Sequence, residues 1–368
     1  GPATLLLILD GVADEPHPAL DGQTPLAAAH TPYLRMLAES GGQGQIMTGE
    51  GIPHTDEGMW ALLTTHPPDP PVGRGLCEAI GAGIPVPPGS VVFRGNMATV
   101  RADGSLVDRR AGRINAGVSD LIAGLSAVRL RGGIRGSIHV GHEHRVVVAL
   151  HGAGLSDHVS DTDPGGASLV QQIQVPVPTM DSPEAARTAG ALRELLDTAA
   201  RHLMAHPYNA ERRARGLLAA NCIITRGAAL YDKPRVGLVK EDSALIAACP
   251  TALGIARMAG MLPVRGPTMT GNLDTDLDAK FSVALKLLSE RQFVVLHVKG
   301  TDIAAHERRP VAKRDFISKV DAALGKMLEV APRGLRVVVS GDHGTSSVTG
   351  NHLACPVPLL IANWQGPG

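Results

Sequence analysis

The chain has 368 residues, of which 44% are hydrophobic, so it can bury the core of two domains or of one large domain with an insertion. Its 35 basic residues balance its 35 acidic residues and aromatic residues make up only 2%, which argues against a basic, base-stacking surface for nucleic acid. No run approaches the roughly 18 apolar residues of a membrane span, and four scattered cysteines without a CxxC pair argue against a zinc knuckle or a disulfide framework.

The first segment alternates strand and helix patterns. The apolar run from Leu5 to Asp10 indicates a buried parallel strand, and residues Thr31 to Glu39 are typical of a helix. No basic-then-apolar leader precedes Leu5, so we expect a soluble, cytoplasmic protein. The first two residues, Gly1-Pro2, are typical of a protease-cleavage remnant, which hides the natural start.

A segment of different character follows the Pro-rich string HPPDPP at residues 66 to 71. Shorter strands are predicted at Val91 to Arg94 and Arg145 to Leu150, and an Ala/Arg-rich helix at Pro183 to His206. From about Asn221 the strand and helix alternation returns, through Ala244 to Ala248, Thr251 to Met261 and Asp276 to Glu290. We therefore expect residues 1–72 and 226–368 to build one core domain, with residues 73–225 inserted as an α+β cap.

Three apolar runs of the core segments each stop at a side chain of a type that can bind metals. They are Leu5 to Asp10, Phe293 to Asp302, and Leu335 to Asp342-His343. In open α/β sheets the reactive groups collect just past the carboxyl ends of such strands, so these side chains should converge on one rim.

Further ligands stand near two of these runs. His306 lies four residues after Asp302, which places both on one face of a helical turn. His352 lies nine residues after His343, in a Gly-rich loop. Taken singly, an Asp after a strand is typical of a turn and a DxxxH pair of a solvated helix face. Their shared position instead favours a site for two Zn or Mn ions, about 4 Å apart, of the kind that clamps a phosphoryl group.

Thr55 opens a helix-like stretch and is the candidate nucleophile. Its hydroxyl could be activated by a metal, and the amino end of the helix would help to hold a phosphate. The alternative is that Thr55 serves only as a helix N-cap. Spacing alone leaves both interpretations open.

These residues, in this order, resemble the alkaline phosphatase superfamily, and the whole chain resembles the archaeal-type, cofactor-independent phosphoglycerate mutases. The likeness covers nearly all of the chain and is carried by LDGVAD, GQTPLAAAHTPYLRMLAESG, GRGLCEAIGAGI, FRGNMATV, LVDRRAGRI, HEHRVVV, GLSDHVSDTDP, GIARMAGM, LDTDL, VKGTDIAAH and SGDHG. It implies an alkaline-phosphatase-like α/β core, with a mostly parallel sheet flanked by helices and an inserted α+β cap domain.

The resemblance also implies two divalent metal ions, Mn or Zn with Mg or Co as alternatives. The ligands carried over for one ion are Asp10, Thr55, Asp342 and His343, and those for the other are Asp302, His306 and His352. In this family the nucleophilic hydroxyl takes the phosphoryl group as a covalent intermediate and returns it to a different oxygen of the same substrate, without a bisphosphate cofactor.

The cap of such enzymes binds the phosphate and carboxylate of a small phosphorylated metabolite. The candidates here, for which an ordinary surface side chain is the alternative, are Arg94, Arg109, Arg110, Arg113, Arg145, Arg226 and Lys240. Asp161 is the candidate acid/base carboxylate. Asp163 is its alternative, and an Asx-turn before Pro164 could explain either one.

Three positions depart from the family pattern: Thr55 replaces the usual serine, Met59 a histidine, and Cys355 an aspartate. Interconversion of 3- and 2-phosphoglycerate is the leading hypothesis. A phosphatase, phosphodiesterase or phosphonate-processing hydrolase is the second, and a catalytically degenerate phospho-ligand-binding protein the third. We expect no nucleic-acid or membrane partner, and the sequence leaves the oligomeric state open.

Overall fold

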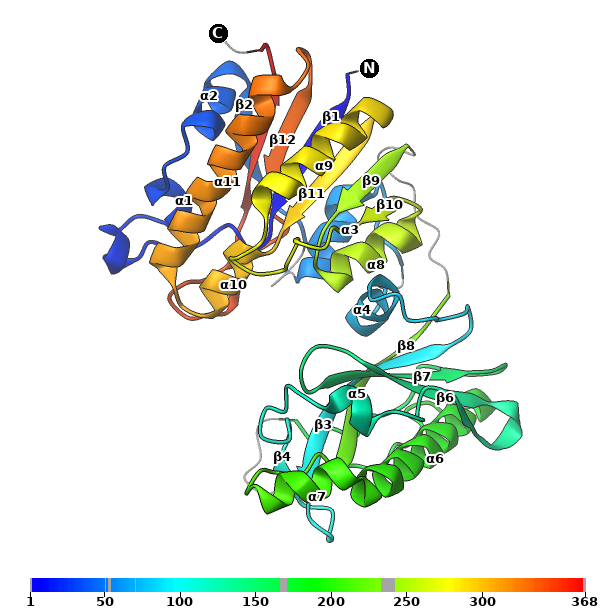
Figure 1. Ribbon diagram of the computed structural model, residues 1–368. Helices are drawn as coiled ribbons and strands as arrows, with labels where there is room; N and C mark the ends of the chain where they lie inside the picture. The colour runs from blue at the N-terminus through cyan, green and yellow to red at the C-terminus, as the bar shows by residue number, and fades with distance from the viewer. Residues whose placement is uncertain are drawn as a thin grey trace. The chain divides into compact units, whose positions relative to one another are not determined.

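The computed structural model describes residues 2–49, 51, 54–69, 71–165, 171–232 and 242–366. The chain divides into two compact units, one formed by Gly1–Pro71 with Pro234–Gly368 and the other by Val72–Lys233 (Figure 1). The boundary expected near residue 225 falls inside a strand of the second unit, because that strand, β8 (Cys222–Leu230), pairs along its length with β3 (Val91–Val100).

The first unit is built on a seven-stranded sheet with the order β10-β9-β11-β1-β12-β15-β2. Neighbouring strands from β10 to β12 run parallel, and β15 and β2 are added antiparallel. Its strands are β1 (Thr4–Leu9), β2 (Gly42–Ile46), β9 (Ser243–Ile246), β10 (Leu262–Val264), β11 (Phe293–Val298), β12 (Arg336–Ser340) and β15 (Val357–Asn363), and a separate hairpin pairs β13 (Gly344–Thr345) with β14 (His352–Leu353). The expected α/β core with a mostly parallel sheet is therefore confirmed.

Helices connect these strands. They are η1 (Pro18–Leu20), α1 (Pro25–Ala28), α2 (Pro32–Ser40), α3 (Thr55–Leu63), α8 (Pro250–Ala259), α9 (Leu277–Glu290), α10 (Gly300–His306) and α11 (Pro310–Val330). Alternate residues of β1, such as Leu5 and Leu7, are fully buried in one cluster with Phe281 of α9 and Phe316 of α11. Because parallel strands are covered on both faces, their sequences are almost continuously apolar, and this made β1, β11 and β12 easy to locate.

The second unit is an antiparallel sheet with the order β4-β3-β7-β6-β5, and β8 pairs with β3. Its further elements are α4 (Arg74–Gly81), β4 (Leu106–Asp108), α5 (Val118–Leu121), β5 (Val128–Arg129), η2 (Arg131–Gly133), β6 (Arg135–Val140), β7 (Arg145–His151), α6 (Pro183–Ala205) and α7 (Pro207–Ala214). Val91 packs in a core with α6, whereas its neighbour Val92 packs with α4. Since successive side chains of a strand point to opposite faces, α6 and α4 cover the two faces of this sheet.

One strand is longer than the sequence predicts. The strand expected at Val91 to Arg94 continues to Val100, because β7 and β8 pair with it on either side. All four cysteines are free thiols. Among the described residues, no helix combines the length and the apolar character that crossing a membrane requires.

Candidate active site

The carboxyl ends of three adjacent strands bring the predicted ligands of the first unit together. β11, β1 and β12 lie side by side and parallel. Asp10 therefore follows β1 at the edge where Asp302 follows β11 and Asp342 follows β12. The three carboxylates are at most 2% exposed. This is the arrangement that the apolar runs of the sequence predict.

Thr55 is the first residue of α3, and its hydroxyl lies within this cluster. Its Oγ1 is 3.4 Å from Oδ2 of Asp10, 3.2 Å from Nε2 of His343 and 3.4 Å from Nζ of Lys299. The N-cap position belongs to His54, whose backbone N–H donates to Glu57. The interpretation of Thr55 as only an N-cap is therefore wrong, and its buried hydroxyl faces three ionisable side chains.

Two groups of side chains offer ligand atoms that lie within 4.8 Å of one another, and both could hold a metal ion. One group is Asp10, His297 and Asp342, and the other is Asp302, His343 and His352. Nε2 of His343 is also 3.1 Å from Oδ1 of Asp10, so this imidazole lies between the two groups. Carboxylate oxygens and imidazole nitrogens are ligands that suit Zn or Mn.

His306 lies beside the second group. Its Nε2 is 3.2 Å from Oδ1 of Asp302 and 3.2 Å from Nε2 of His352, while its Nδ1 is 2.7 Å from the carbonyl oxygen of Gly350. The hairpin of β13 and β14 brings His352 to this place, where its ring stacks on that of His343 at 4.0 Å. All seven predicted metal-ligand positions thus lie in one cluster, counting Thr55.

The electrostatics of the cluster fit a cation. Oδ2 of Asp342 is buried without a hydrogen-bond partner. Burial and the neighbouring charge of Asp10 raise the pKa of Asp342 to about 7. Burial opposes ionisation of Asp10 as well, but Lys299, His297 and His343 hold the pKa of that carboxyl well below its usual range. A divalent ion would offset the cost of burying these carboxylates.

The sequence prediction missed two side chains of this site, Lys299 and His297. Nζ of Lys299 is 3.1 Å from Oδ2 of Asp10 and 2.7 Å from Oδ2 of Asp302. Nε2 of His297, on β11, is 3.0 Å from Oδ2 of Asp10. A polar residue inside the apolar run FVVLHV was the available signal for His297, because buried polar side chains almost always have a partner.

A buried ion pair supports the loops that carry these ligands. Lys313 is 0% exposed, and its Nζ donates to Oδ2 of Asp14 at 2.9 Å, to the carbonyl of Gly11 at 2.7 Å and to that of Thr345 at 3.0 Å. The loop after β1 and the loop after Asp342 are thereby joined through a single ammonium group.

In the second unit, three of the predicted arginines lie on the α4 face of the sheet. Arg94 of β3 pairs in register with Arg226 of β8, and Arg145 of β7 pairs with Asn96, two residues along β3 from Arg94. Nε of Arg94 is 3.8 Å from Oε2 of Glu78. Burial lowers the pKa of Arg94, and the charge of Glu78 raises it. These three arginines thus lie on one face of the sheet near a single carboxylate, that of Glu78, among the described contacts. Such an excess of guanidinium groups suits the binding of an anion.

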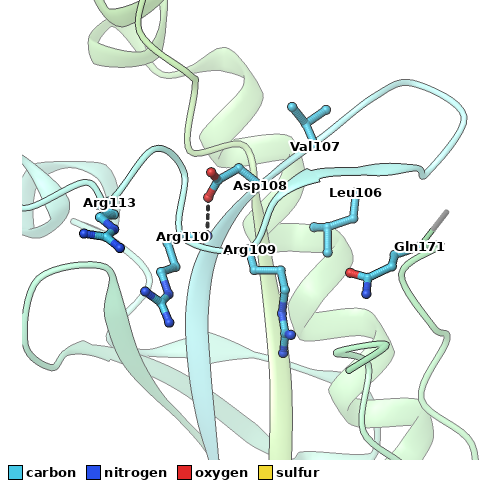
Figure 2. A pocket seen from close by; sticks show the side chains of 7 residues that line it. All are labelled: Leu106, Val107, Asp108, Arg109, Arg110, Arg113 and Gln171. Atoms are coloured by element: carbon cyan, nitrogen blue, oxygen red, sulfur yellow. Dashed lines mark hydrogen bonds between the residues drawn. The ribbon is translucent and has the colours of Figure 1, made fainter. Parts of the chain in front are cut away.

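Three more arginines lie in the loop after β4, where a cavity of about 440 Å³ is lined by Arg109, Arg110 and Arg113 (Figure 2). Figure 2 shows Arg109 and Arg110 extending on the same side of the loop. Nη2 of Arg109 is 2.6 Å from Oδ2 of Asp163. Residues Ala111 and Arg113 have φ values of 47° and 57°, a left-handed conformation that costs energy outside glycine and is frequent at functional sites.

The two candidate acid/base carboxylates differ in their partners. Asp163 accepts a hydrogen bond from the backbone N–H of Gly165 at 3.1 Å, the Asx-turn that the sequence allows, and its side chain is also paired with Arg109. Asp161 is exposed and accepts from the backbone N–H of Gly227, the residue after Arg226, at 2.9 Å. Lys240 lies outside the described residues.

Buried carboxylates and imidazoles at the carboxyl edge of a mostly parallel sheet define the class of protein, a metal-dependent enzyme. Residues 246–366 match the family model of the metalloenzyme superfamily. Residues 38–209 match the model described as 2,3-bisphosphoglycerate-independent phosphoglycerate mutase. The chain belongs to the family of 2,3-bisphosphoglycerate-independent phosphoglycerate mutases and is an isomerase-type enzyme that depends on a divalent metal.

Curated relatives with this name match nearly all of this chain. The mutase of Methanoculleus marisnigri is 40% identical, with 99% of this chain and 88% of the relative covered. Mutase 1 of Archaeoglobus fulgidus is 37% identical, with 98% and 88% covered. Each of these two matches covers at least 98% of this chain.

Solved structures share the fold. The PH0037 protein of Pyrococcus horikoshii matches with a TM-score of 0.79 at 28% identity, over 98% of this chain and 87% of that one. The cofactor-independent phosphoglycerate mutase of Thermoplasma acidophilum matches with a TM-score of 0.69 at 28% identity, over 100% of this chain and 91% of that one.

Proposed function

We propose that this enzyme interconverts 3-phosphoglycerate and 2-phosphoglycerate through a phosphorylated Thr55. The observation that carries the proposal is the position of Thr55, a residue that is 1% exposed and whose hydroxyl oxygen lies 3.2 to 3.5 Å from His343 and Asp10. The relatives named as mutases independent of 2,3-bisphosphoglycerate support this substrate pair. An enzyme without that cofactor needs an acceptor of its own for the phosphoryl group, and Thr55 supplies it.

Two divalent ions, Mn or Zn, complete the proposed site. Asp10, Thr55, Asp342 and His343 would hold one, and Asp302, His306 and His352 the other. His343 also lies close to Asp302 and His352, but its contact of 3.1 Å with Asp10 favours the first ion. His297 would orient Asp10 of the first group through the hydrogen bond from its Nε2. When bound, such ions lower the pKa of the nucleophilic hydroxyl and neutralise charge on the phosphoryl group.

The phosphoryl group is transferred in two steps, first to Thr55 and then back to the substrate. In the first, Oγ1 of Thr55 loses its proton and forms a bond to phosphorus while the bond from phosphorus to the substrate oxygen breaks, and that oxygen takes up a proton. In the second, the other substrate hydroxyl loses its proton and bonds to phosphorus, and Oγ1 departs and regains a proton. Phosphoryl group and protons are conserved over the cycle, so no co-substrate is consumed.

The unit of residues 72–233 acts in this proposal as the substrate cap. The arginines on its α4 face and those of the β4 loop would bind the phosphate and carboxylate of the glycerate in bidentate pairs. Asp161 would carry the proton between the two substrate hydroxyls. Its exposure and its position beside Arg226 favour it over Asp163, which is already paired with Arg109.

The test combines product analysis with a nucleophile series. Purified enzyme loaded with Mn²⁺ should convert 3-phosphoglycerate to the 2-isomer, and acid-quenched enzyme should carry phosphate on Thr55 by mass spectrometry. Thr55→Ala should abolish both, and Thr55→Ser should retain both because the hydroxyl is kept. Release of inorganic phosphate in place of the isomer would identify a hydrolase instead, and conversion by the Ala variant would refute the covalent route.

A further inference from the structure

The ammonium group of Lys299 lies between the two groups of metal-binding side chains. Nζ is 3.1 Å from Oδ2 of Asp10, which belongs to one group, and 2.7 Å from Oδ2 of Asp302, which belongs to the other. It is also 3.4 Å from Oγ1 of Thr55. One side chain thus contacts a carboxylate from each group and the nucleophilic hydroxyl.

This position brings Lys299 into competition with cations. The oxygens that Nζ contacts belong to carboxylates that would bind the ions, and like charges at such distances repel strongly in a buried site. A lysine is charged at neutral pH, and the two carboxylates within 3.1 Å of Nζ favour that charge. Lys299 and a pair of cations therefore cannot all keep these contacts at once.

The Lys299 side chain is partly exposed and can change its position. Lys299 follows directly after β11 and is 14% exposed, whereas Asp10 is 0% exposed. Its four-carbon stem is flexible. A phosphoryl group on Oγ1 of Thr55 would carry nearly two negative charges within reach of Nζ, a partner that replaces the carboxylates.

We propose that Lys299 is a catalytic residue whose ammonium group competes with cations for Asp10 and Asp302 and binds the phosphoryl group at Thr55. The inference rests on the proposed transfer through Thr55. Beside Asp10 and Asp302 the ammonium group reduces the repulsion between the buried carboxylates, and beside the phosphoryl group it stabilises the charge that moves to Thr55.

The other buried lysines of the unit do not fit this role. Lys313 is held by Asp14 and by two backbone carbonyls. Nζ of Lys280 lies 3.4 to 3.5 Å from the carbonyl oxygens of His297 and Thr270. Of these three lysines, all within the ranges that the structure describes, Lys299 is the one whose ammonium group reaches the hydroxyl of Thr55.

The experiment measures Mn²⁺ affinity and turnover separately in Lys299→Met. Affinity, from calorimetry or from the electron paramagnetic resonance of free Mn²⁺, should rise by about tenfold or more because the competing ammonium is lost. The kcat for 3-phosphoglycerate should fall by roughly 100-fold or more because a donor to the transferred charge is lost. A purely structural lysine would weaken both properties together.

Two further variants make the result decisive. Lys299→Arg keeps the charge, so its Mn²⁺ affinity should stay near that of the wild type, and it serves if the Met variant does not fold. Lys326→Met removes an exposed ion pair with Asp278, 2.9 Å long, and should change neither quantity. Unchanged or weaker Mn²⁺ binding in Lys299→Met would overturn the inference. Because binding is measured without substrate, that outcome is distinct from a failure of the wild type to form the 2-isomer.

Discussion

His297 shows how a single buried polar residue can set the geometry of its neighbour. Burial lowers its pKa and the charge of Asp10 raises it, and the net direction is down, so the ring is neutral. Since the partner is a carboxylate, Nε2 must donate the hydrogen bond to Oδ2 of Asp10, 3.0 Å away. Nδ1 is buried without a partner. The ring therefore holds Asp10 through one nitrogen only.

This asymmetry predicts different outcomes for two amide substitutions. The amide nitrogen of glutamine can replace Nε2, whereas that of asparagine replaces Nδ1. We expect His297→Gln to keep Mn²⁺ affinity near the wild-type value, and His297→Asn to lose about 10- to 100-fold, as is typical when a group that orients a metal ligand is removed. Calorimetric titration with Mn²⁺ measures both.

The His297→Gln and His297→Asn variants control for each other. Both variants leave a shorter or more flexible polar group in β11, so a loss of stability should affect them alike, and thermal melting reports that loss. Equal Mn²⁺ affinities for the Gln and Asn variants would show that His297 does not orient Asp10 through Nε2.

Helix α3 can place Thr55 beside Asp10 and His343 because the residue one turn later is Gly58. A Cβ atom at Gly58 would be 2.2 Å from the backbone oxygen of Asp342, a contact that real side chains do not make. The helix is thus packed directly on the loop that follows β12. We expect Gly58→Ala to lower kcat about 100-fold, because pushing the helix away displaces the Thr55 hydroxyl from Asp10 and His343. Steady-state kinetics with 3-phosphoglycerate measure the effect.

Gly190 provides the matched control for this substitution. It also lies within a helix, α6, but a Cβ atom placed there would meet nothing within 4 Å, so Gly190→Ala should stabilise the protein by about 0.5–1 kcal/mol and leave kcat unchanged. Wild-type kcat in Gly58→Ala would mean that α3 can move without displacing Thr55.

Elements differ in how far their sequence determines them. β1, β11 and β12 could be located because parallel strands buried on both faces are continuously apolar, and the ligands stand at their ends. The contact between Lys299 and Asp10 could not be predicted, because it depends on β11 lying next to β1 in the sheet order. The full length of β3 likewise depends on pairing with β8, more than 100 residues away. The pattern of residues within a strand carries no information on which distant strand will pair with it.

At the scale of the whole molecule, the two units have separate hydrophobic cores. The core of the first unit joins β1, β11 and β12 to α9 and α11, and that of the second joins β3 and β7 to α6. All the proposed metal ligands belong to the first unit. A cation that binds only the native state stabilises the part of the structure that holds its ligands.

Removal of the cations should therefore destabilise the two units unequally. At a free Mn²⁺ concentration about 100 times the Kd, binding contributes roughly 2.7 kcal/mol to the native state. Hydrogen exchange followed by mass spectrometry should show faster exchange in peptides covering β1, α10 and β12 after chelation. Asp10 and Asp342 lie just past the ends of β1 and β12, and Asp302 lies in the first turn of α10. Peptides covering β3, β7 and α6 should exchange at the same rate with and without Mn²⁺, since their core contains none of the ligands. Equal acceleration in both units would mean that cation binding stabilises the molecule as one cooperative body. The prediction that cations stabilise only the first unit would then be wrong.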